Sequence, residues 1–206
     1  MTHWLNHSLV LAADFRVEDV GRVRLALERR EGALAGLGAH HALIYESTAE
    51  PGRVLVMIAI HARDPLLELI RSRSIFEWFD AMGVMDIPAV FAGELAERVA
   101  TGNHLRPAAP EVMVSIVTPI DDLAVLLAHV HDTVDRLGTA GVRTVLTFNA
   151  FDNPHEVMML LQIDEEQHAH SWLNHSELAA EWLETAGFGA YPPVFVGRFR
   201  GTVRVD

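Results

Sequence analysis

The stretch Gly38–Ile60, GAHHALIYESTAEPGRVLVMIAI, recurs 103 residues later as Gly141–Ile163, GVRTVLTFNAFDNPHEVMMLLQI. Identical residues fall in register at Gly38/Gly141, Leu43/Leu146, Pro51/Pro154, Val54/Val157 and Ile60/Ile163. Each copy places strand-forming residues on both sides of a turn sequence, Glu50-Pro51-Gly52 or Asp152-Asn153-Pro154. Such runs around proline, glycine and asparagine predict two strands joined by a tight turn. The duplication therefore predicts two copies of one hairpin.

The repeat extends in both directions. Upstream, the apolar runs Ser8–Asp14 and Glu111–Val117 predict a first strand, and apolar residues at helical spacing predict a helix after each run. Downstream, a second helical pattern follows each hairpin, and one inserted residue changes the offset to 104. Apolar segments that open with proline then predict closing strands at Ala89–Val99 and Val194–Val205. Each copy thus has the order β-α-β-β-α-β, the ferredoxin-like arrangement.

Local signals place the helix ends. Thr118-Pro119 and Asp64-Pro65 each combine a capping residue with proline, a pattern typical of helix starts. We expect the helix that opens at Asp64 to end at Gly83 and to bury Leu66, Leu69, Ile70, Phe76 and Phe79.

The chain therefore divides into a first ferredoxin-like repeat at residues 1–100, a linker at 101–110 and a second repeat at 111–206. The linker is polar, contains glycine and proline, and has no periodicity. The hairpin strands are apolar at consecutive positions, which indicates burial on both faces. We predict an α+β fold in which two tandem ferredoxin-like βαββαβ repeats pack sheet to sheet as an intramolecular dimeric α/β barrel.

This arrangement resembles the dimeric α/β-barrel superfamily in a fused form. Its members include antibiotic-biosynthesis monooxygenases, heme-degrading monooxygenases and muconolactone isomerases. The local match is Trp172–Trp182, WLNHSELAAEW, which is similar to the tryptophan, small-polar and apolar spacing of the monooxygenase-like branch. The resemblance implies a pocket between helix and sheet, and we place Trp172 and His175 in it.

The heme-degrading branch combines an asparagine, a tryptophan and a histidine. Trp172 fits the tryptophan, but Trp182 stands where that branch has its heme-ligating histidine, and the strand Val112–Val117 holds no asparagine. The resemblance therefore disfavours heme degradation. We expect no cofactor, although heme binding stays open.

Composition limits the compartment and the partners. The 206-residue chain has no cysteine, which excludes disulfides and thiolate chemistry. Its net charge of −12, without a segregated basic patch, disfavours nucleic acid and anionic membranes as partners. No apolar run approaches the ~20 residues of a membrane span, and the N-terminal residues lack signal-peptide features. We expect a cytoplasmic protein, and exposed sheet edges favour a homodimer.

Twelve histidines are unusual for this length. His41 opens a predicted strand, Tyr45 follows it on the same face, and His61 ends the return strand. Pairing about the turn would bring His41 and His61 to the same end of the sheet, where an imidazole can act as a base near neutrality. His41, Tyr45 and His61 are therefore the candidate catalytic residues. The alternative, that the histidines are solvated strand ends or packing residues, stays open.

Metal chelation is not predicted. His168, His170 and His175 are spaced by two, five and seven residues, which does not put neighbouring imidazoles four residues apart on one helix face. Acidic residues form no clustered set typical of Mg²⁺ or Ca²⁺ sites.

Three functions remain open. The first is a small-molecule-binding α/β barrel, acting as a cofactor-independent monooxygenase-like or proton-transfer enzyme on a small hydrophobic or aromatic ligand. The second is a non-catalytic ligand sensor built from paired ACT-like domains, which the missing glycine after each first strand disfavours. The third is a protein-interaction module that uses a sheet edge. The sequence does not decide whether the protein is an enzyme.

Overall fold

The computed structural model describes residues 9–101, 112–169 and 194–205, so Trp172 and His175 lie outside the described residues. The N-terminal elements are β1 (Leu9–Arg16), α1 (Val20–Arg29), α2 (Glu31–Gly36), β2 (Ala39–Ser47), β3 (Arg53–Ile60), α3 (Arg63–Arg71), α4 (Ser74–Met82) and β4 (Ala89–Ala100). The C-terminal elements are β5 (Val112–Pro119), α5 (Leu123–Asp132), α6 (Val134–Thr139), β6 (Val142–Ala150), β7 (Glu156–Ile163) and β8 (Val194–Arg204). Within these ranges, no helix has the length and apolarity needed to cross a membrane.

The chain forms two compact units. The first unit comprises Met1–Ala92 and Phe199–Asp206, and the second unit comprises Gly93–Arg198. The boundary cuts β4 and β8, so each closing strand begins in one unit and ends in the other. The hydrogen-bonded strand order is closed, β1-β3-β2-β8-β5-β7-β6-β4. The repeats at 1–100 and 111–206 and the linker at 101–110 describe the duplicated sequence and stay a prediction.

The closing strands exchange partners between the sequence repeats. Residues Gly93–Ala100 of β4 pair with β6 of the second unit. At the other end of the chain, the Val205 N–H donates to the His40 carbonyl of β2 at 2.8 Å. The Thr101 N–H donates in the same way to the Arg143 carbonyl of β6 at 3.0 Å. Each central hairpin is therefore completed by the closing strand of the other repeat.

The two units share one strand register. Leu9 pairs with Ile60 in the first unit, and Val112 pairs with Ile163 in the second, which is the same pair at an offset of 103. The turn that joins β2 and β3 contains Gly52 at φ 74°, and the Arg53 N–H donates to the Glu50 carbonyl at 3.2 Å. Proline and glycine thus form the predicted tight turn.

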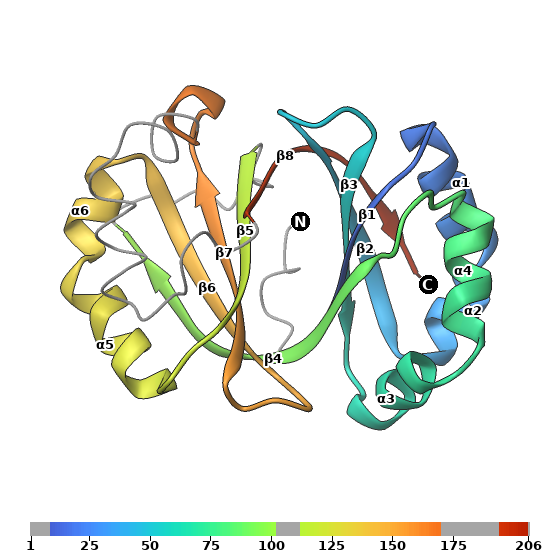
Figure 1. Cartoon of the computed structure of the whole chain (residues 1–206), viewed down its shortest axis with the longest axis horizontal. Helices are drawn as coiled ribbons and strands as arrows, with labels where there is room; N and C mark the ends of the chain where they lie inside the picture. The colour runs from blue at the N-terminus through green and yellow to red at the C-terminus, as the bar shows by residue number, and fades with distance from the viewer. Residues whose placement is uncertain (1–8, 102–111, 170–193, 206) are drawn as a thin grey trace. The chain divides into compact units, whose positions relative to one another are not determined.

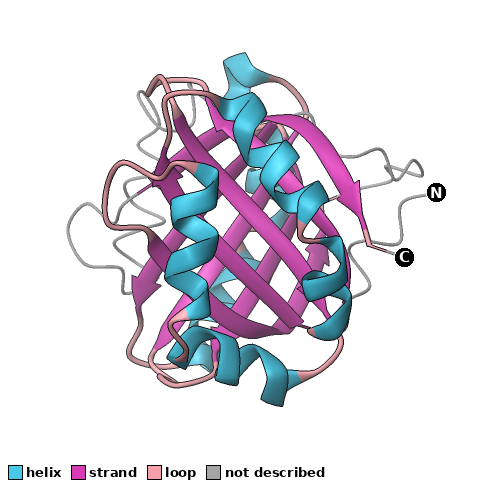
Figure 2. Ribbon diagram, turned by 90° about the vertical axis from the view of Figure 1, so that its right-hand side faces the viewer, coloured by secondary structure: helices cyan, strands magenta, loops and turns pink. Residues whose placement is uncertain are grey.

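Helices lie on one face of the strands in each unit. In the first unit α1 and α4 are in contact and run side by side (Figure 1). The ribbon viewed from this side shows the helices lying across the strands (Figure 2). In the second unit, apolar residues of α5, including Leu126 and Val130, pack on the helix-facing side of β5, β6 and β7.

Two predicted helix starts are wrong. Strand β5 continues through Pro119, and α5 begins only at Leu123, because the Asp122 carboxylate accepts from the Ala124 N–H at 2.7 Å and caps the helix. Helix α3 begins at Arg63, so Asp64 lies inside the first turn instead of capping it. Pro65 is tolerated there because N–H groups in the first turn have no partner within the helix.

The predicted single helix after the first hairpin is two helices. The break lies between α3 and α4, where the Ser72 hydroxyl donates to the Leu69 carbonyl at 2.8 Å. Because of this break, the side chains of α4 do not continue the helical phase of α3. Phe76 is therefore 65% exposed, contrary to the expected burial, while Phe79 is buried. Helix α4 ends before Gly83, as predicted, with this glycine in the left-handed region at φ 76°.

Candidate functional site

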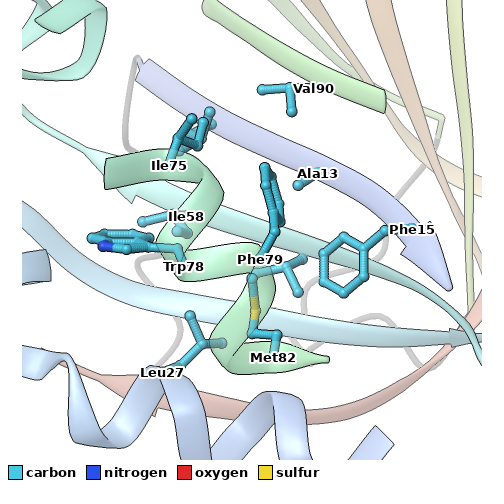
Figure 3. Close-up of a pocket in the computed structure, with 11 residues that line it drawn as sticks. Ala13, Phe15, Leu27, Ile58, Ile75, Trp78, Phe79, Met82 and Val90 are labelled. Carbon is cyan, nitrogen blue, oxygen red and sulfur yellow. The ribbon is translucent and has the colours of Figure 1, made fainter. Parts of the chain in front are cut away.

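An apolar pocket lies in the first unit, between the helix-facing side of the sheet and helices α1 and α4 (Figure 3). The space, counted with its opening to solvent, is about 370 Å³. The lining residues are Leu11, Ala13, Phe15, Leu27, Val56, Ile58, Ile75, Trp78, Phe79, Met82 and Val90. This pocket belongs to the first unit, whereas the predicted pocket residues Trp172 and His175 belong to the second repeat and stay a prediction.

The pocket lining combines residues from one face of the sheet with one stripe of residues on helix α4. Ala13 pairs with Val56 and Leu11 pairs with Ile58, and side chains of paired residues lie on the same face of a sheet. Helix α4 contributes Ile75, Trp78, Phe79 and Met82, whose spacing of three, four and seven residues forms one helical stripe. Figure 3 shows this stripe directed toward the strand residues.

Aromatic rings form much of the wall. The Phe15 and Phe79 rings meet edge to face, with centroids 5.7 Å apart and planes at 66°. Trp78 is only 8% exposed, whereas Val90 is 39% exposed. The opening to solvent is therefore beside Val90, and the rings lie deeper. Every lining side chain is uncharged, so the wall favours an apolar ligand over a polar one.

Two of the equivalent sheet positions in the second unit carry larger side chains, whereas Val114 and Thr118, which stand in place of Leu11 and Phe15, are smaller. At an offset of 103, Ile116 stands in place of Ala13 and Met159 in place of Val56. Both side chains are fully buried in the core of the second unit. Ala13 thus leaves more room on this face of the first-unit sheet than Ile116 leaves at the equivalent position.

The candidate catalytic residues do not line this pocket. His41 pairs with Ala59 and Tyr45 pairs with Leu55, so both lie on the sheet face opposite Val56 and Ile58. The predicted common face of His41 and Tyr45 is confirmed by this register. Their role in catalysis, with His61, stays a prediction.

Tyr45 is fully buried, and its ring contacts Phe199 with centroids 5.6 Å apart. Among the described residues, no group forms a hydrogen bond with its hydroxyl. Burial raises the pKa of Tyr45 far above its ordinary value, so the phenol stays protonated near neutrality. Tyr45 is therefore unsuited to act as a base.

The histidine contact in the structure is between His40 and His61. Their ring centroids are 3.7 Å apart, with planes at 69°. Burial, and secondly the neighbouring His61, lower the pKa of His40 below its ordinary value. The sequence predicted that His41 and His61 lie at the same end of the sheet, and the ring that contacts His61 is that of His40, at the bulge between Ala39 and His41.

In the second unit a histidine pairs with an aspartate. The His168 ring nitrogen Nδ1 and the Asp164 carboxylate are 2.7 Å apart. The hydrogen bond to Asp164, with its negative charge, raises the pKa of His168. Burial opposes ionisation of Asp164, but the hydrogen bond and charge of His168, with Arg143 nearby, hold its pKa below the ordinary value. The described residues contain no group of three or more potential metal ligands.

Sequence reasoning missed the residues that form the pocket. Phe15, Phe79 and Met82 read as ordinary core residues, and Trp78 as a packing residue repeated at Trp182. The available signal was the contrast between Ala13 and Ile116 within an otherwise apolar repeat. A small residue on a strand where its repeat has a large one indicates space beside the helix.

The fold matches solved structures over nearly the whole chain. An anthrone oxidase-like protein matches with a TM-score of 0.71 at 11% identity, over 97% of this chain and 94% of the other. A putative monooxygenase from Fusobacterium nucleatum matches with a TM-score of 0.59 at 8% identity, over 96% and 94% of the two chains. A heme-degrading enzyme from Listeria monocytogenes matches with a TM-score of 0.53 at 10% identity, over 93% and 99%.

No protein-family model and no curated protein matches the sequence. The structural matches, together with the closed strand order, confirm the α+β class and the ferredoxin-like order of elements. At these identities the likeness concerns the fold and not the activity. The chain thus has the dimeric α/β-barrel fold of antibiotic-biosynthesis-monooxygenase-like proteins, with its two ferredoxin-like halves in one chain.

Proposed function

We propose that the protein binds a small, flat, aromatic molecule in the first-unit pocket and acts on it as a cofactor-independent, monooxygenase-like enzyme. The observation that carries this proposal is the uncharged, aromatic-lined space between α4 and the sheet. Edge-to-face and stacked contacts with Phe15, Trp78 and Phe79 favour a planar ring system. The likeness to an anthrone oxidase-like protein supports the same class of ligand.

The chemistry that suits such a wall is oxidation of a substrate that is already activated. An anthrone-type compound has an acidic methylene group between two aromatic rings. Reaction with O₂ converts this CH₂ group into a carbonyl and releases one molecule of water, so atoms and electrons balance without a further reductant. In this proposal the lining residues bind and orient the substrate and exclude water from the reacting carbon.

The described wall does not fit heme. Apart from the Met82 thioether, no described lining side chain carries a group that ligates heme iron. None carries a positive charge for the heme propionates. We therefore assign no step to heme, and we include heme among the compounds to be tested.

The proposal predicts that Ala13→Ile removes ligand binding, because it places the side chain of Ile116 at the equivalent position of the first unit. We expect at least a tenfold loss of affinity for anthrone, anthraquinone or a related tricyclic probe, measured by tryptophan fluorescence titration. The matched control is Ala12→Ser, which introduces the second unit's Ser115 on the opposite sheet face. This control should bind like the unchanged protein.

Thermal unfolding of each variant separates lost binding from lost folding. Unchanged affinity in a folded Ala13→Ile variant would contradict the pocket assignment. Oxygen consumption with anthrone then tests the enzymatic part. Binding without consumption of O₂ above the uncatalysed rate would support the non-catalytic ligand sensor, because the described wall lacks a titratable group.

A further inference from the structure

His40 and His61 meet at a corner whose backbone is held from three strands. His40 is the extra residue of the bulge in β2, and its carbonyl accepts from the Val205 N–H at 2.8 Å. His61 follows the end of β3, and its N–H donates to the Gly38 carbonyl at 3.0 Å. These bonds fix both Cα positions, so the contact between the two imidazoles does not depend on mobile loops.

The second unit has the equivalent backbone hydrogen bonds at this corner, but with different side chains. The Asp164 N–H donates to the Gly141 carbonyl at 3.1 Å, and the Thr101 N–H donates to the Arg143 carbonyl at 3.0 Å. Arg143 and Asp164 occupy the positions of His40 and His61, and their opposite charges attract. The fold therefore accepts two side chains of opposite charge at this corner, and the histidine pair is not required by the backbone.

We propose that His40 and His61 form a two-histidine site for a divalent transition-metal ion, with Zn²⁺, Ni²⁺ and Cu²⁺ as the class of ligand. Imidazole nitrogen is a preferred donor for these ions. The ring centroids are 3.7 Å apart, which places two donor groups within reach of one ion. The site lies on the first unit and is separate from the pocket, because neither histidine lines the pocket.

Chelation requires a small movement. With metal–nitrogen distances of about 2.0–2.1 Å and tetrahedral angles, two bound nitrogens lie roughly 3.3 Å apart and the ring centroids about 5 Å apart. His61 is exposed, so its ring can rotate outward to reach this geometry. Water would complete the coordination, as in a metal site with an open position. The ion would join the bulge of β2 to the end of β3.

Isothermal titration of the full chain with ZnCl₂ or NiCl₂, after removal of bound metal, tests the site. We expect one class of bound ion to disappear in His40→Ala and equally in His61→Ala, with no further loss in the double variant. Equal losses in the single and double variants are the sign of two ligands to one ion. His155→Ala, at an exposed histidine of the second unit, should keep the wild-type stoichiometry.

A second variant keeps the test independent of folding. His40→Arg combined with His61→Asp installs the two oppositely charged residues that the second unit has at the same corner, so the fold should persist while the metal ion is lost. Bound metal should raise the melting temperature of the unchanged protein and not that of this variant. Identical stoichiometry and identical thermal shifts in the two proteins would overturn the proposal.

Discussion

Tyr45 illustrates what one residue contributes to this fold. Its ring fills space against Phe199, but its buried hydroxyl has no hydrogen-bond partner among the described residues. A buried polar group without a partner costs about 1–3 kcal/mol of desolvation. The second unit has Phe148 at the equivalent position, which fills the same kind of space without this cost.

We therefore expect Tyr45→Phe to leave the free energy of unfolding unchanged or to raise it by up to about 1–3 kcal/mol. The reciprocal Phe148→Tyr should lower it by a similar amount, because it buries a new hydroxyl. Urea unfolding measures both. A loss of more than about 1 kcal/mol in Tyr45→Phe would show that the hydroxyl has a partner, such as a bound water or ligand.

The His168–Asp164 pair gives a prediction for pH. Asp164 has a lowered pKa, so its contribution to stability is present above the ordinary value of 3.8 and is lost as the pH falls through the lowered pKa. His168 has a raised pKa, so its contribution is complete below the ordinary value of 6.5 and is lost as the pH rises through the raised pKa.

Asp164→Asn should return the pKa of His168 toward 6.5, because it removes the negative charge and the hydrogen bond that raise it. NMR titration of the His168 ring protons in both proteins measures the change. An unshifted His168 would show that Asp164 does not set its protonation.

At the scale of the elements, glycines with positive φ set the geometry of turns and helix ends. Gly52 in the β2–β3 turn has φ 74°, and a Cβ atom there would lie 2.4 Å from the Val17 carbonyl oxygen. Gly83 after α4 has φ 76°, but a Cβ atom there would lie 3.0 Å from the end of the flexible Arg22 side chain. The two positions therefore differ in how much an added methyl group costs.

We expect Gly83→Ala to lower the free energy of unfolding by about 1–2 kcal/mol, the cost of a left-handed non-glycine residue. Gly52→Ala should cost clearly more, since its methyl group collides with backbone that cannot move aside. Chemical denaturation measures the free energy of unfolding of both variants. The reference variant is Gly32→Ala, because a Cβ atom there would meet no described atom within 4 Å. Equal losses at Gly52 and Gly83 would contradict this reasoning.

Local signals account for which elements were predictable. Runs of strand-forming residues around proline, glycine and asparagine predicted the hairpins, and Gly83, which is left-handed in the structure, predicted the end of α4. The helix starts were misplaced because Thr118-Pro119 and Asp64-Pro65 resemble caps, whereas the choice of cap depends on which side chain reaches the free N–H groups. Asp122 does so for α5. Phe76 was misassigned because the break after α3 changes the helical phase.

For the whole molecule, the duplication predicted the order of elements and the α/β-barrel fold, which the structural matches confirm. The exchange of β4 and β8 was not predictable, because apolar alternation shows that a segment is a strand but not which strand it pairs with. The sequence predicted an apolar pocket between helix and sheet, but it placed Trp172 and His175 of the second repeat in it. The residues of the first-unit pocket were not predicted, because their apolar pattern is the same as that of a filled core.

The two units differ in the side chains at two equivalent places, one on the sheet face under the helices and one at the hairpin ends. Ala13 lies beside a space under α4, whereas Ile116 and Met159 are buried in the core of the second unit. The corner at the hairpin ends carries two histidines in the first unit and an arginine and an aspartate in the second. The two units thus share one strand register, and the side chains that form both proposed sites belong to the first unit.

The most direct test of the central proposal is methyl NMR of the full chain, labelled at Ile, Leu and Val, during titration with a tricyclic aromatic probe such as anthraquinone. We predict shifts of Leu27, Ile58 and Ile75, which line the pocket, and unchanged signals of Val114, Val130 and Leu161 in the second unit. Saturation at one probe molecule per chain is the expected stoichiometry. Shifts confined to the second unit, or no saturable shift at Ile58 and Ile75, would contradict the account.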